Sequence, residues 1–354
     1  MTHPPRKVLI IKPSSLGDVV TALPVLRGLR RTFPQARISW LLSAGCAPLL
    51  EGDGDLDEII LFDRRGLGRW WRSTRGFGDL WRFQKRLRHA GFDWVIDLQG
   101  LLRSSLFAAF SNADVRAGFV DPREKLAGLF YTHKYSPTQV HTVGRNVELA
   151  RQMGIDAKCE EMTLKVTPAG RAFAESTCCL HNLRPGGFIV AVPPTRWRTK
   201  LYPPRHWRSV IQRIIPRCPV VIAGTPADEP MCREISAGFA DGVVNLAGKT
   251  NVPQLVGLLS AAGAVICSDS AAMYIAPAVA VPVVALLGPT RPERTGPVPP
   301  SRMIISPAPC RGCLKRRCRH VTCMELITPA EVARVSLDIL EPVLADKKSP
   351  CGDT

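Results

Sequence analysis

The chain has 354 residues, of which 45% are hydrophobic and 22% are charged. This length allows two domains with their own cores, and the composition excludes a short disulfide scaffold and a disordered chain. Lysine and arginine outnumber aspartate and glutamate by 47 to 30, which gives a formal net charge of +17. Such an excess predicts an anionic partner, which could be a phosphate compound, a nucleic acid or an acidic membrane surface.

The beginning of the chain and its cysteines predict a cytoplasmic protein. Residues 1–7 lack the apolar core of a signal peptide and lead directly into a strand-like run. The uncharged stretch 271–288 contains Pro277 and Pro282, so we interpret it as a buried helix followed by a buried strand, not as a membrane span. Twelve cysteines without a secretory signal are typical of reduced thiols.

Short β-branched runs alternate with amphipathic segments along the chain, a pattern typical of an α/β fold with parallel sheets. The first series of elements has predicted strands at 8–11, 37–42, 58–61 and 94–98, and predicted helices at 18–32 and 80–89. After a turn signal at 184–187, a second series has predicted strands at 188–192, 220–223, 243–246, 264–267 and 283–287. A capping box at 328–331 starts a last helix that runs to about residue 344.

Two successive series predict two doubly wound domains that face a central cleft, with ligands at the carboxyl ends of the strands. We expect an N-terminal domain over 1–165, a linker over 166–187, a C-terminal domain over 188–327 and a C-terminal helix over 328–346. The second domain includes a cysteine-rich segment, residues 310–323.

Chemistry-bearing residues follow the first predicted strand, in the sequence KPSSLGD at 12–18. This is neither a Walker loop nor a dinucleotide fingerprint, so ATP hydrolysis and NAD chemistry lose their usual support. Asp18 stands at the start of the next helix. It either caps that helix or serves as a functional carboxylate.

Residues 8–24, VLIIKPSSLGDVVTALP, resemble the opening of the family 9 glycosyltransferases, the bacterial lipopolysaccharide heptosyltransferases. The resemblance continues in family order at DLQG, RAG, PPTRWRTK, SDS and LGPT, which occupy 97–100, 116–118, 193–200, 268–270 and 287–290. Segments 122–131 and 141–145 are most similar to the family member that adds the first heptose.

The resemblance implies a GT-B fold of two Rossmann-like domains, with the acceptor on the first and the sugar nucleotide on the second. It implies an inverting, metal-independent transfer of heptose from ADP-heptose to the Kdo–lipid A core of lipopolysaccharide, with no cofactor. Asp18 would be the general base that deprotonates the acceptor hydroxyl, which is chemistry that one well-placed carboxylate can perform. The expected location is the cytoplasmic face of the inner membrane, as a peripheral protein.

On the donor side, the resemblance implies that Lys200 and Asp269 contact the nucleotide sugar. A metal-free reaction needs protein cations to offset the charge on the leaving diphosphate, and threonine hydroxyls can donate beside them. The chain departs from the family at two places, with Ala271 for a glycine and Tyr274 for a histidine. The full predicted donor set is Thr195, Thr199, Lys200, Asp269, Ser270, Ala271 and Tyr274.

On the acceptor side, residues 63–88 hold nine Lys or Arg against two Asp, with three tryptophans interleaved. Arginine pairs with carboxylates and phosphates, and tryptophan suits a sugar face or a membrane interface. The alternative is a solvated basic helix, which is favoured for 85–88. The predicted acceptor-binding residues are Lys12, Ser15, Arg69, Arg72, Arg123 and Arg145.

Four cysteines stand close together within the cysteine-rich segment, at Cys310, Cys313, Cys318 and Cys323. Four thiolates at this spacing predict a structural zinc or an iron–sulfur cluster. The alternative is four reduced or redox-active thiols in a loop.

Two other functions compete with heptose transfer. The substitutions at 271 and 274 favour a related GT-B enzyme that uses another nucleotide sugar. The charge and the cysteines together would suit a nonenzymatic nucleic-acid-binding protein with a zinc module, although the chain has no recognised nucleic-acid module.

Overall fold

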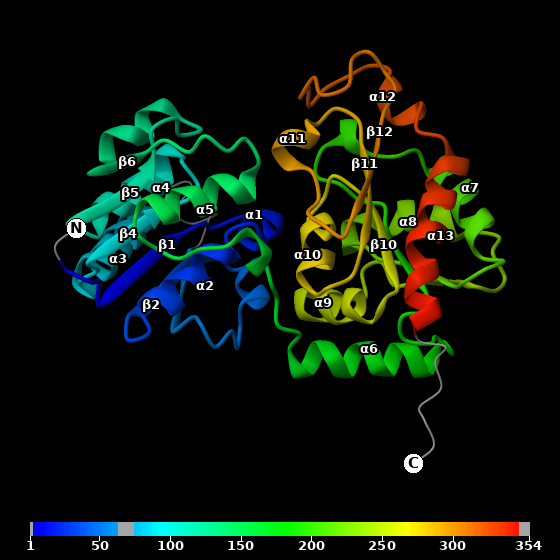
Figure 1. Ribbon diagram of the computed structural model, residues 1–354, viewed down its shortest axis with the longest axis horizontal. Coiled ribbons are helices and arrows are strands. Elements are labelled where there is room, and N and C mark those ends of the chain that lie inside the picture. Colours follow the sequence, from blue (N-terminus) through cyan, green and yellow to red (C-terminus); the bar gives the residue numbers. More distant parts are fainter. Residues whose placement is uncertain (1–2, 63–73, 347–354) are drawn as a thin grey trace. The chain divides into compact units, whose positions relative to one another are not determined.

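The computed structural model describes residues 3–62 and 74–346. Contacts divide the chain into two compact units, Met1–Thr163 and Leu164–Thr354, which we call unit 1 and unit 2 (Figure 1). The division falls two residues before the predicted end of the first domain. The predicted linker 166–187 contains a helix, α6 (Pro168–Leu180), that belongs to unit 2.

Unit 1 is built on a six-stranded parallel sheet in the order β3-β2-β1-β4-β5-β6. Its strands are β1 (Lys7–Ile11), β2 (Arg37–Ser43), β3 (Glu58–Phe62), β4 (Trp94–Asp97), β5 (Val115–Phe119) and β6 (His133–Tyr135). Strand β1 lies in the middle, with Ile10 opposite Trp40 of β2 and Ile96 of β4. All four strands predicted in this half are confirmed, whereas β5 and β6 were not predicted.

Helices cover both faces of this sheet. They are α1 (Leu16–Val20), α2 (Leu23–Thr32), α3 (Thr74–Ala90), α4 (Leu102–Phe110) and α5 (Thr142–Gln152), with short 3-10 helices η1 (Ala47–Leu49), η3 (Lys125–Phe130) and η4 (Cys159–Glu161). Helix α2 packs on α5, and α4 contacts both α3 and η3. The single helix predicted over 18–32 is wrong, because the chain breaks at 21–22. Pro24 in the first turn of α2 lacks an N–H group and starts a new helix instead of continuing α1.

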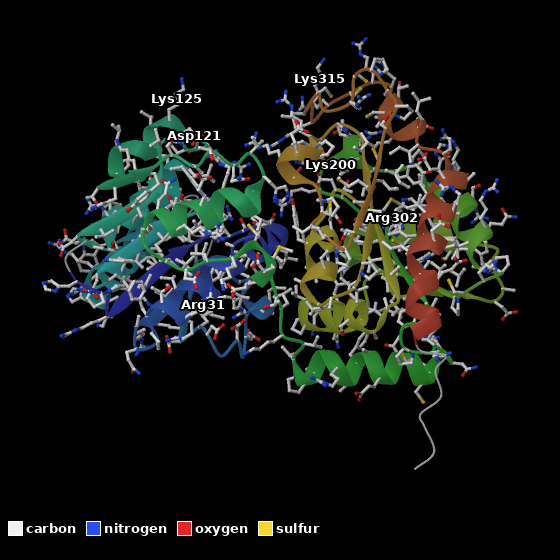
Figure 2. The ribbon with its side chains drawn as sticks, viewed as in Figure 1. Arg31, Asp121, Lys125, Lys200, Arg302 and Lys315 are labelled. Atoms are coloured by element: carbon white, nitrogen blue, oxygen red, sulfur yellow. The ribbon has the colours of Figure 1, made fainter. Side chains whose placement is uncertain are left out.

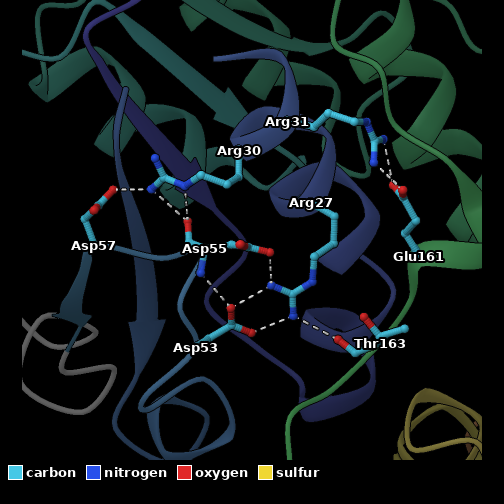
Figure 3. Close-up of polar contacts among 8 residues, drawn as sticks. All are labelled: Arg27, Arg30, Arg31, Asp53, Asp55, Asp57, Glu161 and Thr163. Atoms are coloured by element: carbon cyan, nitrogen blue, oxygen red, sulfur yellow. Dashed lines mark hydrogen bonds and ion pairs between the residues drawn. The ribbon is translucent and has the colours of Figure 1, made fainter. Parts of the chain in front are cut away.

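Ion pairs hold α2 in place at one end of unit 1 (Figure 3). Arg27 contacts Asp53 and Asp55 at 2.6 Å each, and its side chain is only 10% exposed. Arg30 pairs with Asp57, and Arg31 reaches Glu161 in η4. These contacts connect α2 to the loop before β3 and to the last residues of the unit.

Unit 2 repeats the architecture of unit 1. Its strands are β7 (Ile189–Val192), β8 (Val220–Ile222), β9 (Val243–Asn245), β10 (Ala264–Ser268), β11 (Val283–Leu287) and β12 (Arg302–Ile305). They form a second six-stranded parallel sheet in the order β12-β11-β10-β7-β8-β9. In both sheets the strand order reverses at the first strand of the unit, so adjacent loops diverge at β1/β4 and at β7/β10. Such switch points are where doubly wound sheets bind ligands.

The helices of unit 2 are α6, α7 (Pro204–Ile214), α8 (Glu229–Ser236), α9 (Val252–Ala261), α10 (Ala272–Ala278), α11 (Pro292–Thr295), α12 (Thr322–Glu325) and α13 (Pro329–Asp346), with 3-10 helices η5 (Arg198–Lys200) and η6 (Pro226–Asp228). Helix α13 packs against α7 (Figure 1), around the buried Trp207. On the other side α6 crosses α9, where Gly257 approaches the backbone of Gly170.

The stretch 271–288 forms α10 and then the buried strand β11, as predicted. Among residues 3–62 and 74–346, no helix has the length and apolar character needed to cross a membrane.

Candidate active site

In unit 1, Lys12 and Asp18 lie at the switch point between β1 and β4. Lys12 directly follows β1 and is 4% exposed, and its Nζ donates to the Leu98 carbonyl at 2.5 Å, just beyond β4. Burial lowers the pKa of Lys12, and the nearby carboxylates of Asp18 and Asp97 only partly counter this.

Asp18 both caps α1 and remains available for chemistry. Its Oδ2 accepts hydrogen bonds from the Ser15 N–H and the Ser15 hydroxyl, each at 2.8 Å. Within the described residues no group donates to Oδ1. Burial by itself would raise the pKa of Asp18, but the Lys12 ammonium and the two Ser15 hydrogen bonds outweigh it, so this pKa lies below its usual value. Asp18 is therefore an ionised carboxylate with one oxygen open to a ligand.

Asp97, at the end of β4, organises the neighbouring turn. Its carboxylate accepts from the Tyr131 and Ser104 hydroxyls at 2.7 Å each, and from the N–H groups of Gln99 and Gly100. Burial raises the pKa of Asp97 despite these hydrogen bonds. The sequence analysis included Asp97 in the DLQG motif but assigned it no role. Its hydrogen-bond partner Tyr131 lies 34 residues further along the chain, so the sequence alone did not show their contact.

Two glycines make room for this arrangement. A Cβ on Gly118 would lie 2.3 Å from the ring of Tyr131, so no other residue fits there without moving the ring. Gly100 has φ +66°, and its carbonyl accepts from Glu124 N–H at 3.0 Å. This turn holds Arg123 close enough to Lys12 and Asp18 to influence the pKa of both.

The predicted acceptor residues are therefore only partly brought together. Lys12, Ser15 and Arg123 surround Asp18, whereas Arg145 pairs with Asp121 at 2.6 Å and stacks on Phe119. Arg69 and Arg72 lie outside the described residues.

In unit 2, Lys200 and Asp269 meet at the second switch point. Lys200 lies in the loop after β7 and Asp269 directly after β10, with Nζ and Oδ2 2.9 Å apart and both side chains nearly buried. The Lys200 ammonium also stands 4.3 Å from the ring centre of Trp197. Lys200 and Asp269, which the sequence analysis assigned to the donor, therefore form an ion pair with each other.

The hydroxyl groups of this region differ in their availability. Thr195 donates to the Trp197 carbonyl and Thr199 to the Lys315 carbonyl, so both fix the loop after β7. The hydroxyls of Ser268 and Thr290 are buried at the ends of β10 and β11 and have no hydrogen-bond partner among the described residues. Buried polar groups in proteins are nearly always paired, so these two hydroxyls are available to bind a ligand.

The remaining predicted donor residues lie around the start of α10. Ser270 stands beside the Cys267 thiol, and Ala271 precedes the first residue of the helix. Tyr274 is 7% exposed and donates from its hydroxyl to the Thr295 carbonyl at 2.8 Å. This tyrosine connects α10 to the end of α11.

The four cysteines of the cysteine-rich segment are free thiols, three exposed and Cys323 buried. Burial, with a contribution from the other three sulfurs, raises the pKa of Cys323 to about 11. Cys318 accepts hydrogen bonds from the backbone N–H groups of His320 and Val321, which lower its pKa. In the part of the chain that the structure describes, no three His, Cys, Asp or Glu side chains are arranged to hold a metal ion, so the predicted metal site is not confirmed.

Comparison with known proteins identifies the family. The model of glycosyltransferase family 9 (heptosyltransferase) matches residues 80–323. The chain is 30% identical to lipopolysaccharide heptosyltransferase 1 of Pseudomonas aeruginosa over 325 residues, 89% of this chain and 88% of the relative. It is also 30% identical to lipooligosaccharide heptosyltransferase 2 of Haemophilus influenzae over 318 residues, 84% of this chain and 88% of the relative.

A solved structure has the same fold. The Escherichia coli heptosyltransferase WaaC with ADP-2-deoxy-2-fluoro heptose superposes with a TM-score of 0.75 at 23% identity, covering 94% of this chain and 99% of that one. The predicted fold class, GT-B with two Rossmann-like parallel sheets, is confirmed. The chain belongs to glycosyltransferase family 9.

Proposed function

We propose that this chain transfers heptose from ADP-heptose to the Kdo–lipid A core of lipopolysaccharide, with inversion at the anomeric carbon and without a metal. The observation that carries the proposal is Asp18, an ionised carboxylate at the β1/β4 switch point with one oxygen open. Family membership favours a glycosyltransferase over the nucleic-acid-binding alternative. The names of the relatives and the ADP-heptose analogue bound to the WaaC structure support heptose as the sugar.

In the proposed mechanism, Asp18 accepts the proton of the acceptor hydroxyl through Oδ1. The hydroxyl oxygen then attacks the anomeric carbon directly, so the configuration inverts. Lys12 and the Ser15 donors keep Asp18 ionised and oriented before the proton is transferred. In unit 2, Lys200 offsets the negative charge of the departing ADP, and Asp269 holds the ammonium in place.

We assign the acceptor to unit 1. Arg123 is exposed next to Asp18, and a guanidinium there suits the carboxylates of Kdo. Arg145 is already paired with Asp121, so its contact with the acceptor would require that ion pair to open. Because segments 122–131 and 141–145 carry the closest resemblance to the first heptosyltransferase, we assign this chain to the first heptose, with the second as the alternative.

The acceptor is a lipid, and unit 1 carries exposed apolar side chains suited to a membrane on two elements that both contact α4. Phe77 and Trp81 lie one turn apart on α3, and Leu126 and Leu129 lie on η3, all more than half exposed. Lys125 beside them projects outward from unit 1 (Figure 2). Apolar side chains interleaved with cations favour binding to an anionic membrane surface. We propose a peripheral protein on the cytoplasmic face of the inner membrane.

Calorimetry with ADP, UDP and GDP tests the donor. We expect ADP to bind with a micromolar Kd and the other two to bind much more weakly. Lys200→Gln should weaken ADP binding at least tenfold, because it removes a charge-assisted contact. Arg213→Gln on the exposed side of α7 is the control and should leave the affinity unchanged.

A transfer assay with Kdo–lipid A as acceptor then tests the reaction. If calorimetry shows a preference for UDP or GDP, the result would support the alternative function, a related GT-B enzyme that uses another nucleotide sugar. Absence of binding to all three nucleotides would contradict the proposed function.

A further inference from the structure

The cysteine-rich segment 310–323 is attached to the loops around Lys200. The N–H groups of Gly312 and Leu314 donate to the carbonyls of Gly288 and Pro289, just after β11, at 3.0 and 2.7 Å. Thr199, next to Lys200, donates to the Lys315 carbonyl at 2.9 Å. Figure 2 shows Lys200 and Lys315 on the same side of unit 2. These contacts fix the segment at the carboxyl end of the sheet.

This attachment places a second cation on Trp197. The Arg316 guanidinium carbon lies 4.5 Å from the centre of an indole that the Lys200 ammonium approaches to 4.3 Å. The indole attracts both cations, but the two positive charges repel each other. Asp269 neutralises Lys200 only, and in the described part of the chain Arg316 forms no ion pair with a carboxylate. The cluster therefore has one positive charge in excess.

The surroundings of Arg316 suit an anionic ligand. Arg316 is exposed, so a ligand can reach it, and its planar group can hold two phosphate oxygens at once. The unpaired buried hydroxyls of Ser268 and Thr290 lie at the ends of β10 and β11, the second just after Pro289, to which the segment bonds. Tyr274, close to Asp269 in sequence, supplies no charge, since its hydroxyl bonds the Thr295 carbonyl.

We propose that Arg316 binds the terminal phosphate of the nucleoside diphosphate and, with Lys200, stabilises it as it leaves. In the transfer step, the bond between the anomeric carbon and the phosphate oxygen breaks, and its electron pair stays on that oxygen. The new bond forms to the acceptor oxygen, whose proton passes to Asp18. Arg316 binds the phosphate of the leaving oxygen through charge-assisted hydrogen bonds and takes no proton. This assignment rests on the proposed function and adds a specific residue to it.

The test compares ADP with AMP by calorimetry in Arg316→Gln, Arg316→Lys and the control Arg319→Gln, an exposed arginine of the same segment. Arg316→Gln should weaken ADP binding about tenfold to a hundredfold and AMP binding by less than threefold, because only ADP carries the terminal phosphate. Arg316→Lys should recover part of the loss, and Arg319→Gln should bind both nucleotides as the unaltered protein does. In the transfer assay, kcat should fall with Arg316→Gln.

Other results would overturn the assignment. Unchanged ADP affinity in Arg316→Gln, while the unaltered protein binds ADP, would remove Arg316 from the site and leave the proposed function standing. Equal losses of affinity for ADP and AMP would show that Arg316 holds Trp197 in place and does not bind the terminal phosphate. If the unaltered protein binds no ADP, the proposed function itself fails, which is a distinct result.

Discussion

Asp18 performs two tasks with one side chain, because its two oxygens have different partners. Oδ2 fixes the start of α1 through Ser15, while Oδ1 stays open. The two interpretations that the sequence left open, a helix cap or a functional carboxylate, are therefore compatible. Capping holds the carboxylate in one orientation, which a general base needs.

Asp18→Asn separates the two tasks, because the amide oxygen of asparagine can accept the two Ser15 hydrogen bonds but cannot take up the proton of a hydroxyl group. We expect kcat for heptose transfer to fall by about a hundredfold to ten-thousandfold. ADP affinity and thermal stability should stay close to those of the unaltered protein. Asp114→Asn, an exposed aspartate of the same unit, is the control for transfer assays.

The pH dependence provides a second check on Asp18. The pKa of Asp18 in the folded protein lies below the usual carboxylate value, so Asp18 is ionised throughout the neutral range. Its contribution to the free energy of unfolding is lost as the pH falls from the usual carboxylate pKa through this lowered pKa. Activity should therefore show no acid limb from Asp18 above about pH 4. Normal turnover in Asp18→Asn would rule out its role as the base.

At this scale, the sequence located site residues that follow central strands. Lys200 and Asp269 were both assigned to the donor, and they follow β7 and β10, two adjacent parallel strands whose carboxyl ends lie together. The contact of Arg316 with Trp197 could not be predicted, because it depends on how an irregular loop folds back. The sequence analysis assigned a role only to the cysteines of this segment.

Among the elements, buried strands were the most predictable, because β-branched runs between turn signals have few other structures open to them. Edge strands such as β6 are short and half exposed, so they lack that signal. Helix α6 lies in the predicted linker, where a proline-started helix with few large apolar residues resembles a loop in sequence. Close helix packing explains its small residues.

The crossing of α6 and α9 depends on facing glycines. A Cβ on Gly257 would lie 2.0 Å from the Gly170 carbonyl oxygen, so Gly257→Ala must push the helices apart. We expect a loss of about 3 kcal/mol in the free energy of unfolding, as for other overpacked sites. Chemical denaturation of the purified variant measures it.

Gly78→Ala is the matched control, a helical glycine of α3 with no atom within 4 Å of the added Cβ. It should raise stability by about 0.5–1 kcal/mol, since alanine is the better helix former. If Gly257→Ala leaves the free energy of unfolding unchanged, α6 and α9 do not pack as closely as described.

For the whole molecule, we expect the net charge of +17 and the exposed apolar side chains of α3 and η3 in unit 1 to contribute together to membrane binding. We expect the protein to sediment with phosphatidylglycerol vesicles at low salt, and less at high salt because ions screen the attraction. Replacing Trp81 and Leu129 by serine should weaken binding by about tenfold or more, since less apolar area enters the interface.

Leu180→Ser is the control for this experiment, because Leu180 on α6 is 77% exposed but lies in unit 2. If it weakens vesicle binding as much as the two changes in unit 1, the membrane surface is not where we place it. Equal binding to neutral phosphatidylcholine vesicles would show that the protein's charge does not contribute to membrane binding.

The repeated strand order has a consequence for how such enzymes diversify. Each sheet carries its own switch point, and the residues we assign to the acceptor and to the donor come from separate units. A substitution at Ala271 or Tyr274 therefore changes residues assigned to the donor and leaves the residues assigned to the acceptor as they are. The donor specificity of such an enzyme can therefore change in one unit while its acceptor specificity is kept in the other, or the reverse.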